Sequence, residues 1–156
     1  MPVRNPNATR PWQHVLEPLG GYLCLAEALA AAEASHSQPN RYAEAFNFGP
    51  LLEANRPVRQ LIDAALQHWP GAWNDLSGAG AVHEAGRLHL QIDKANHQLG
   101  WQPRWPFATT VQRTVDWYQA VHEGVSPMDC CMSDLELYGA TLATLRSSTD
   151  GASGAF

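Results

Sequence analysis

Apolar residues recur at helical spacing along several stretches of the chain. The clearest stretch runs from about Leu16 to Ala34. The apolar face expected for this helix comprises Leu19, Tyr22, Leu23, Ala26, Leu29 and Ala30. Shorter helical patterns cover residues 56 or 57–68, 93–99, 108–122 and 133–145. The sequence therefore predicts a largely helical chain.

The start of the first helix has two distinctive features. Glu17 suits the positive end of the helix dipole, and Pro18 fits the first turn, where its missing N–H costs little. Gly20 and Gly21 weaken the helix by up to about 1 kcal/mol each relative to alanine. We therefore expect another element to approach the helix backbone closely at this point.

Between the helices, three stretches have the character of short strands. Residues 87–92 alternate apolar and polar side chains, residues 44–48 are rich in aromatics, and residues 72–75 follow a Pro-Gly break. Asn55 and Asp93 are placed to cap the helices that follow them. Helices that alternate with short strands indicate an α/β fold, and residues 147–156 are expected to form a disordered tail.

Composition narrows the function classes. The chain has 156 residues, 45% of them hydrophobic, which is enough for one folded domain with a core. The net charge of −5 argues against nucleic acid as a partner. Three cysteines without metal-ligand spacing fit a reducing compartment. Neither a signal peptide nor an apolar run of membrane-spanning length is present, so a cytoplasmic location is expected.

Two motifs of nicotinamide-dependent enzymes are missing from the sequence. A Tyr-x-x-x-Lys pair cannot exist, because Lys94 is the single lysine and Leu90 stands four residues before it. The run from Gly78 to His83 comes nearest to Gly-x-Gly-x-x-Gly, but His83 replaces the third glycine. His83, Glu84 and His89 lack the spacing of a zincin motif, so no metal site is expected.

One segment resembles a known family. The run from Arg4 to Leu19, with Arg-Pro-Trp-Gln-His-Val-Leu-Glu-Pro at residues 10–18, is similar to a segment of the CDP-glucose 4,6-dehydratases, which are extended short-chain dehydrogenases/reductases. Val82-His83-Glu84-Ala85 and Leu99-Gly100-Trp101-Gln102-Pro103 add to this resemblance. It implies that residues 1–146 correspond to the C-terminal, sugar-nucleotide-binding lobe of such an enzyme. The NAD-binding domain and complete Rossmann fold would then be absent.

The resemblance also implies an activity and a set of binding residues. The family is an NAD-dependent lyase that converts CDP-glucose to CDP-4-keto-6-deoxyglucose and water for bacterial surface polysaccharide. Five positions would contact the nucleotide sugar: Arg10 at the diphosphate, Asn47 and Val58 near the nucleotide, and His83 and Glu84 in a loop. From the residues alone, each also has a purely structural interpretation: a surface ion pair for Arg10, a satisfied amide for Asn47, core for Val58 and a solvated loop for the last two.

Because the chemistry-bearing motifs are missing, the chain alone is expected to bind no NAD and to be inactive. Three interpretations remain open. The chain is part of a split or truncated dehydratase whose N-terminal half is separate, a non-catalytic module that binds a nucleotide sugar or a full-length homologue, or a fragment of another nucleotide-sugar epimerase or dehydratase. In each case we expect an exposed apolar surface where the missing half would pack.

Overall fold

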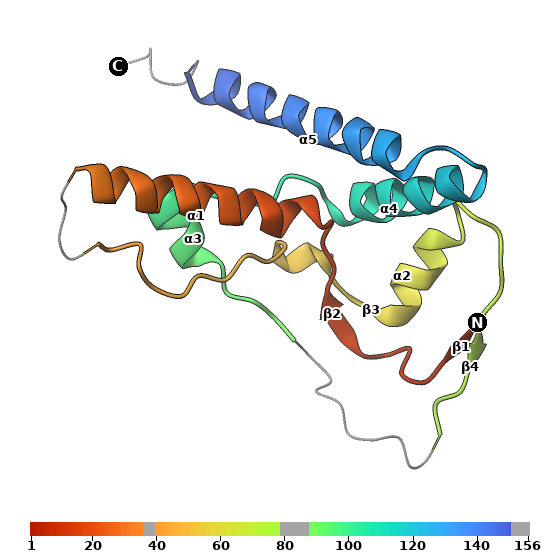
Figure 1. Cartoon of the computed structure of the whole chain (residues 1–156). Helices are drawn as coiled ribbons and strands as arrows, with labels where there is room; N and C mark the ends of the chain where they lie inside the picture. Colours follow the sequence, from red (N-terminus) through yellow and green to blue (C-terminus); the bar gives the residue numbers. More distant parts are fainter. Residues whose placement is uncertain (36–39, 79–87, 151–156) are drawn as a thin grey trace. The chain divides into compact units, whose positions relative to one another are not determined.

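The structure is a computed structural model that describes residues 1–35, 40–78 and 88–150 (Figure 1). The chain divides into two compact units, Met1–Gln112 and Arg113–Phe156. In chain order the elements are β1 (Pro2–Val3), β2 (Thr9–Pro11), α1 (Leu16–Ala34), a 3-10 turn (Leu52–Ala54), β3 (Asn55–Pro57), α2 (Val58–Ala65), β4 (Asn74–Asp75), α3 (Asp93–Leu99), α4 (Phe107–His122) and α5 (Pro127–Asp150). Helices mixed with short strands confirm the predicted α/β class.

The strands of the first unit form two small ladders. β1 pairs in parallel with β4, and β2 pairs antiparallel with β3. The register of the second ladder places Thr9 opposite Pro57, Arg10 opposite Arg56 and Pro11 opposite Asn55. This ladder fastens the segment before α1 to the start of α2 (Figure 1).

The core of the first unit forms where α1 and α3 meet the segment around Phe48. Phe48, Ala95 and Trp101 are its buried members. The rings of Phe48 and Trp101 meet edge to face, with centroids 5.0 Å apart. The predicted close approach at the glycine pair is confirmed, because a Cβ added at Gly21 would lie 2.2 Å from Cδ1 of Phe48.

The predicted inner face of α1 is wrong, although the bounds of the helix agree with the prediction. Leu19, Tyr22 and Leu23 are 45%, 57% and 67% exposed. The helix instead turns Glu17 and Gly21 inward and packs Cys24 and Leu25 against the core. Periodicity identifies the apolar stripe of a helix but not the element that packs against it. In α1, Gly21 and Glu17 determine which side of the helix faces the core.

Glu17 is the most deeply buried side chain of α1, with an exposed fraction of 0%. Its Oε1 accepts a hydrogen bond of 2.7 Å from the backbone N–H of Trp105. Both carboxylate oxygens lie 3.0 Å from the backbone nitrogen of Arg104. The start of α1 is therefore tied to the turn that precedes α4, a role beyond the dipole effect expected from the sequence.

Two of the three predicted strands are not strands in the described residues. Residues 44–48 and 88–92 form no hydrogen-bonded ladder there. A segment whose backbone pairs with no neighbouring strand is not part of a sheet. The two segments nevertheless approach each other, because a Cβ at Gly49 would lie 2.8 Å from Cβ of Leu90. The third prediction, residues 72–75, is confirmed in part by β4.

The helix caps differ from those predicted. α2 begins after Pro57, with no side-chain capping bond, while Asn55 lies in β3. α3 has no side-chain cap either, and the carboxylate of Asp93 accepts from the Gln91 amide. α3 ends at Gly100 in the left-handed region, with φ 64°.

The second unit contains the later turns of α4 and the whole of α5. Nε of Arg113 donates to Oδ1 of Asp134 over 2.8 Å, and Asp134 is buried. α5 begins six residues earlier than predicted and continues to Asp150, so residues 147–150 are helical where a disordered tail was expected. The remaining tail residues lie outside the described part of the chain.

Gly21→Ala tests the contact between α1 and the core. The added methyl collides with the Phe48 ring, and overpacking of this kind costs about 1–3 kcal/mol in the free energy of unfolding. Urea denaturation followed by tryptophan fluorescence measures this loss. Gly139→Ala is the matched control, because a Cβ there meets nothing within 4 Å and alanine favours the helix. Equal stability of the two variants would contradict the contact.

Glu17→Gln tests the buried carboxylate. The amide loses the charge and turns a donor toward backbone N–H groups, which we expect to cost about 1.5–3 kcal/mol in the free energy of unfolding. The control Glu33→Gln alters an exposed acid of the same helix and should stay within about 0.5 kcal/mol. Equally small losses in the free energy of unfolding for the two variants would show that Glu17 does not stabilise the turn at residues 104–105.

Candidate functional site

The β2–β3 ladder brings two of the predicted site residues into one region. Arg10 lies in β2, and Val58 is the first residue of α2, directly after β3. The backbone N–H of Val58 donates to the carbonyl of Ala8 over 3.0 Å, and that of Arg59 to Pro6 over 2.9 Å. Residues 6–10 therefore lie beside the start of α2.

Arg10 is half-buried and held close to the backbone. Its Nη1 donates to the carbonyl of Thr9 over 2.9 Å. Trp12, two residues further on, is also held: its indole N–H donates to the carbonyl of Arg56 over 2.8 Å, and its backbone N–H donates to the carbonyl of Ala54. A guanidinium on so restrained a backbone is suited to bind phosphate oxygens.

Arg56 lies directly opposite Arg10 and was not selected from the sequence. Its Nε donates to the carbonyl of Glu53 over 2.9 Å, and its guanidinium lies 5.0 Å from the centre of the Phe107 ring. In the described residues no carboxylate forms an ion pair with it. The sequence predicted the start of a helix at residue 56 or 57. The register that places Arg56 opposite Arg10 joins two distant strands, so local pattern could not predict it.

Asn47 lies on the neighbouring segment. It is exposed, and its Nδ2 lies 3.4 Å from the carbonyl of Gln91, so part of its hydrogen-bonding capacity is used by backbone. The next residue, Phe48, accepts from Nε2 of Gln13 over 3.1 Å. Residues 47–48 are thereby joined to the segment that carries Arg10. Oε1 of Gln13 is buried without a hydrogen-bond partner among the described residues.

Val58 is half-buried at the beginning of α2, where it fits both a core role and a place beside a ligand. His83 and Glu84 lie outside the described residues. Of the five predicted positions, the structure thus brings Arg10 and Val58 together and joins the segment of Asn47 to theirs.

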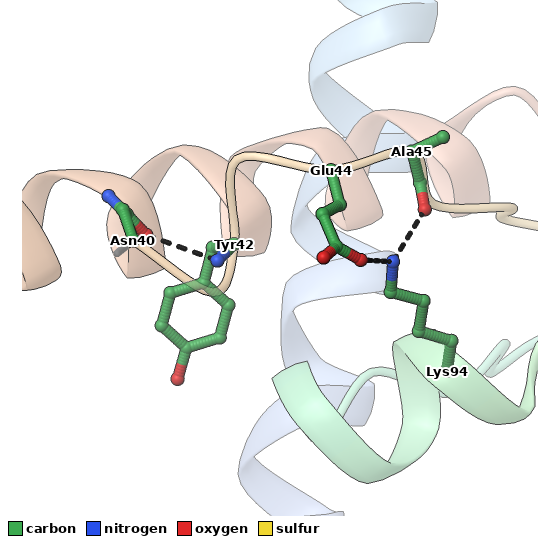
Figure 2. A network of polar contacts seen from close by, with 5 residues as sticks. All are labelled: Asn40, Tyr42, Glu44, Ala45 and Lys94. Carbon is green, nitrogen blue, oxygen red and sulfur yellow. Dashed lines mark hydrogen bonds and ion pairs between the residues drawn. The ribbon is translucent and has the colours of Figure 1, made fainter. Parts of the chain in front are cut away.

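Lys94 contacts the segment formed by residues 44–46. Figure 2 shows its ammonium reaching Glu44 and Ala45, with Nζ 2.5 Å from Oε2 of Glu44 and 3.1 Å from the carbonyl of Ala45. It also lies 4.5 Å from the centre of the Phe46 ring. The hydrogen bond and charge of Lys94 hold the pKa of the Glu44 carboxyl below its ordinary value. Any stabilisation from this pair is therefore present at neutral pH and lost as the pH falls through that lowered pKa.

A groove of about 270 Å³ in the second unit is lined by the Arg113–Asp134 pair, Trp117 and Cys130, and contains none of the predicted site residues. Across residues 1–35, 40–78 and 88–150, no three His, Cys, Asp or Glu side chains gather as metal ligands. Within the same ranges, no helix has an apolar stretch sufficient to cross a bilayer.

Comparison with known proteins identifies a relative of this chain. No family model matches the chain. A CDP-glucose 4,6-dehydratase of Salmonella typhimurium is 38% identical over 138 residues, which cover 87% of this chain. The chain spans 36% of that relative's length. The predicted resemblance is confirmed: over most of its length, this chain is similar to a part of a CDP-glucose 4,6-dehydratase.

Proposed function

We propose that this chain supplies the nucleotide-sugar-binding part of a CDP-glucose 4,6-dehydratase and that its ligand is CDP-glucose. The observation that carries the proposal is the β2–β3 ladder. It places Arg10 beside the start of α2 in a chain 38% identical to part of such an enzyme. In this proposal the Arg10 guanidinium binds the diphosphate, because its planar fork matches phosphate oxygens.

The other predicted residues complete the proposed site. Asn47 retains an amide oxygen that can accept from the nucleotide, and Val58 offers an apolar contact to the base. His83 and Glu84 are assigned by resemblance alone, as a phosphate donor and as an acceptor from the cytosine amine or a sugar hydroxyl. Each of these roles is part of the proposal.

The chain's own residues do not fit NAD. Its sequence has neither the glycine fingerprint nor Tyr-x-x-x-Lys. In the described residues, the strand that runs directly into a helix is β3, and its junction with α2 at Pro57-Val58 contains no glycine. We therefore derive no hydride or dehydration step from this chain, and we propose that it is inactive alone.

Calorimetric titration with CDP-glucose tests the proposal. The wild-type chain should bind CDP-glucose equally well with and without NAD. Arg10→Ala should weaken binding about tenfold or more, because a hydrogen bond to a charged group contributes about 1.5–3 kcal/mol. Arg41→Ala is the matched control, since Arg41 is exposed and pairs with its neighbour Tyr42.

Several outcomes would contradict the proposal. Binding that requires NAD, or that survives in Arg10→Ala, would place the ligand elsewhere. UDP-glucose or dTDP-glucose binding more tightly than CDP-glucose would favour a different nucleotide-sugar enzyme. No binding by a chain with native circular dichroism would reject an autonomous nucleotide-sugar site.

A second candidate function is docking onto a chain that carries the rest of a dehydratase. Its basis is the outer face of α1, where six apolar residues lie half-exposed or more exposed on adjacent turns. They are Val15, Leu19, Tyr22, Leu23, Ala26 and Ala30. Residues 44–48 add a segment that pairs with no strand in the described residues. Such features are typical of surfaces that another protein covers.

The proposed occupant is the part of a dehydratase chain that the match does not include, because the relative extends well beyond the matched segment. Glu27 and Glu33 are exposed on α1, and the helix has no basic residue. A partner surface with an apolar centre and a basic rim would complement it. Docking of this kind would also supply the NAD-binding residues that the chain lacks.

Co-expression with the unmatched part of the Salmonella relative tests docking. The two chains should co-purify, and Leu19→Glu with Leu23→Glu should abolish the complex, because burying a carboxylate on an apolar face is strongly unfavourable. Met128→Glu, at an exposed apolar position in the second unit, is the control. Docking is rejected if the α1 variant co-purifies as well as the control.

A further inference from the structure

The groove between α4 and α5 is lined by residues of the second unit. α4 contributes Arg113, Asp116 and Trp117, and α5 contributes Asp129 and Asp134. Its volume of about 270 Å³ is below the range of roughly 300–1,000 Å³ that is typical of sites for whole small-molecule ligands. The groove is therefore better suited to a single side chain than to a nucleotide sugar.

The carboxylates of this groove outnumber its cations. Nε of Arg113 donates to Oδ1 of the buried Asp134 over 2.8 Å, so this guanidinium is already matched to a carboxylate. The carboxylates of Asp116 and Asp129 form no hydrogen bond or ion pair with the described residues. Because the Arg113–Asp134 pair is neutral as a whole, the other two carboxylates give the groove a net negative charge that attracts cations.

The second unit as a whole has the same imbalance. Residues 113–156 contain six of the fifteen acidic residues of the chain but two of its ten basic residues. This unit therefore carries a formal charge of −4 out of the −5 of the whole chain. A charge concentrated in one part of a chain favours a partner of the opposite sign, because complementary potentials steer the two surfaces together.

Trp117 and its apolar neighbours give the groove a preference among cations. The indole is half-buried, and its ring packs against that of Tyr118 at 80°, with centroids 5.1 Å apart. A guanidinium can stack on an indole and direct its planar fork of N–H donors toward carboxylates. Val125 lines the groove, and Leu137 lies one turn beyond Ser133 on the same side of α5. Both apolar side chains are exposed, so they are available to residues beside the cation.

We propose that the groove between α4 and α5 is a docking site for an arginine side chain of a partner protein. The guanidinium stacks on Trp117 and donates to Asp116 and Asp129, and apolar residues next to the arginine contact Val125 and Leu137. The inference does not rest on the proposed nucleotide-sugar site, because none of the described residues of that site lines the groove. It is also separate from the outer face of α1, which belongs to the first unit.

NMR titration of the nitrogen-15-labelled chain with a synthetic peptide tests the docking site. The probe is an acetylated and amidated pentapeptide, Gly-Leu-Arg-Leu-Gly. A second peptide has citrulline in place of arginine, which keeps the shape of the side chain and removes its charge. The indole Nε1–H signal of Trp117 should shift saturably with the arginine peptide. The citrulline peptide should bind about tenfold or more weakly, because it lacks the charge-assisted hydrogen bonds.

Two double variants locate the binding. Asp116→Asn with Asp129→Asn should weaken the arginine peptide about tenfold or more, because both carboxylate acceptors are lost. Glu27→Gln with Glu33→Gln is the matched control, since it removes the same charge from exposed positions of α1 and should leave the affinity unchanged. CDP-glucose binding should be the same in both variants as in the wild type.

Three results would overturn the docking site. They are the absence of a saturable Trp117 shift in the folded wild type, equal affinity for the two peptides, and equal weakening by the two double variants. The last result would show that the peptide responds to net charge and not to the groove. If the variant with both aspartates replaced fails to fold, the exposed Asp129 is changed alone: reduced affinity in Asp129→Asn supports the docking site, and full affinity overturns it.

Discussion

The buried carboxylate of Glu17 is the constraint on which the arrangement of the first unit depends. A buried carboxyl group is tolerated only where hydrogen bonds replace those it would make to water, and the backbone N–H groups of Arg104 and Trp105 supply them here. The contact joins residues far apart in the chain and fixes the rotation of α1 about its axis. Gly21 is thereby turned toward Phe48, whereas Leu19 and Leu23 are left largely exposed.

The same constraint positions the candidate site. β2 ends five residues before α1 begins, so an anchored helix start restricts where Arg10 can lie. His14, between them, is buried with its ring 4.7 Å from that of Trp105, a second tie to the same turn. The β2–β3 ladder then sets the start of α2 relative to Arg10. The candidate site is made of short segments, and these contacts, rather than an extensive sheet, hold the segments in position.

Local pattern predicted the helices well, because the bounds of α1 and α3 and nearly those of α4 follow from periodicity and flanking residues. It failed wherever the answer depended on a distant partner. Leu19 and Leu23 are largely exposed, and the predicted strands at residues 44–48 and 88–92 form no ladder in the described residues. Arg10 was found through its motif, whereas Arg56 became visible only through strand register.

We propose that the nucleotide sugar binds at the β2–β3 ladder. Nitrogen-15 NMR of the labelled chain during titration with CDP-glucose tests it directly, because the side-chain Nε–H signals of the arginines report on their own surroundings. We expect saturable shifts at Arg10 and Arg56 and at the amides of residues 56–61, with Arg41 and Arg113 unchanged. Shifts confined to the groove around Arg113 and Cys130, or no shifts in a well-dispersed spectrum, would contradict it.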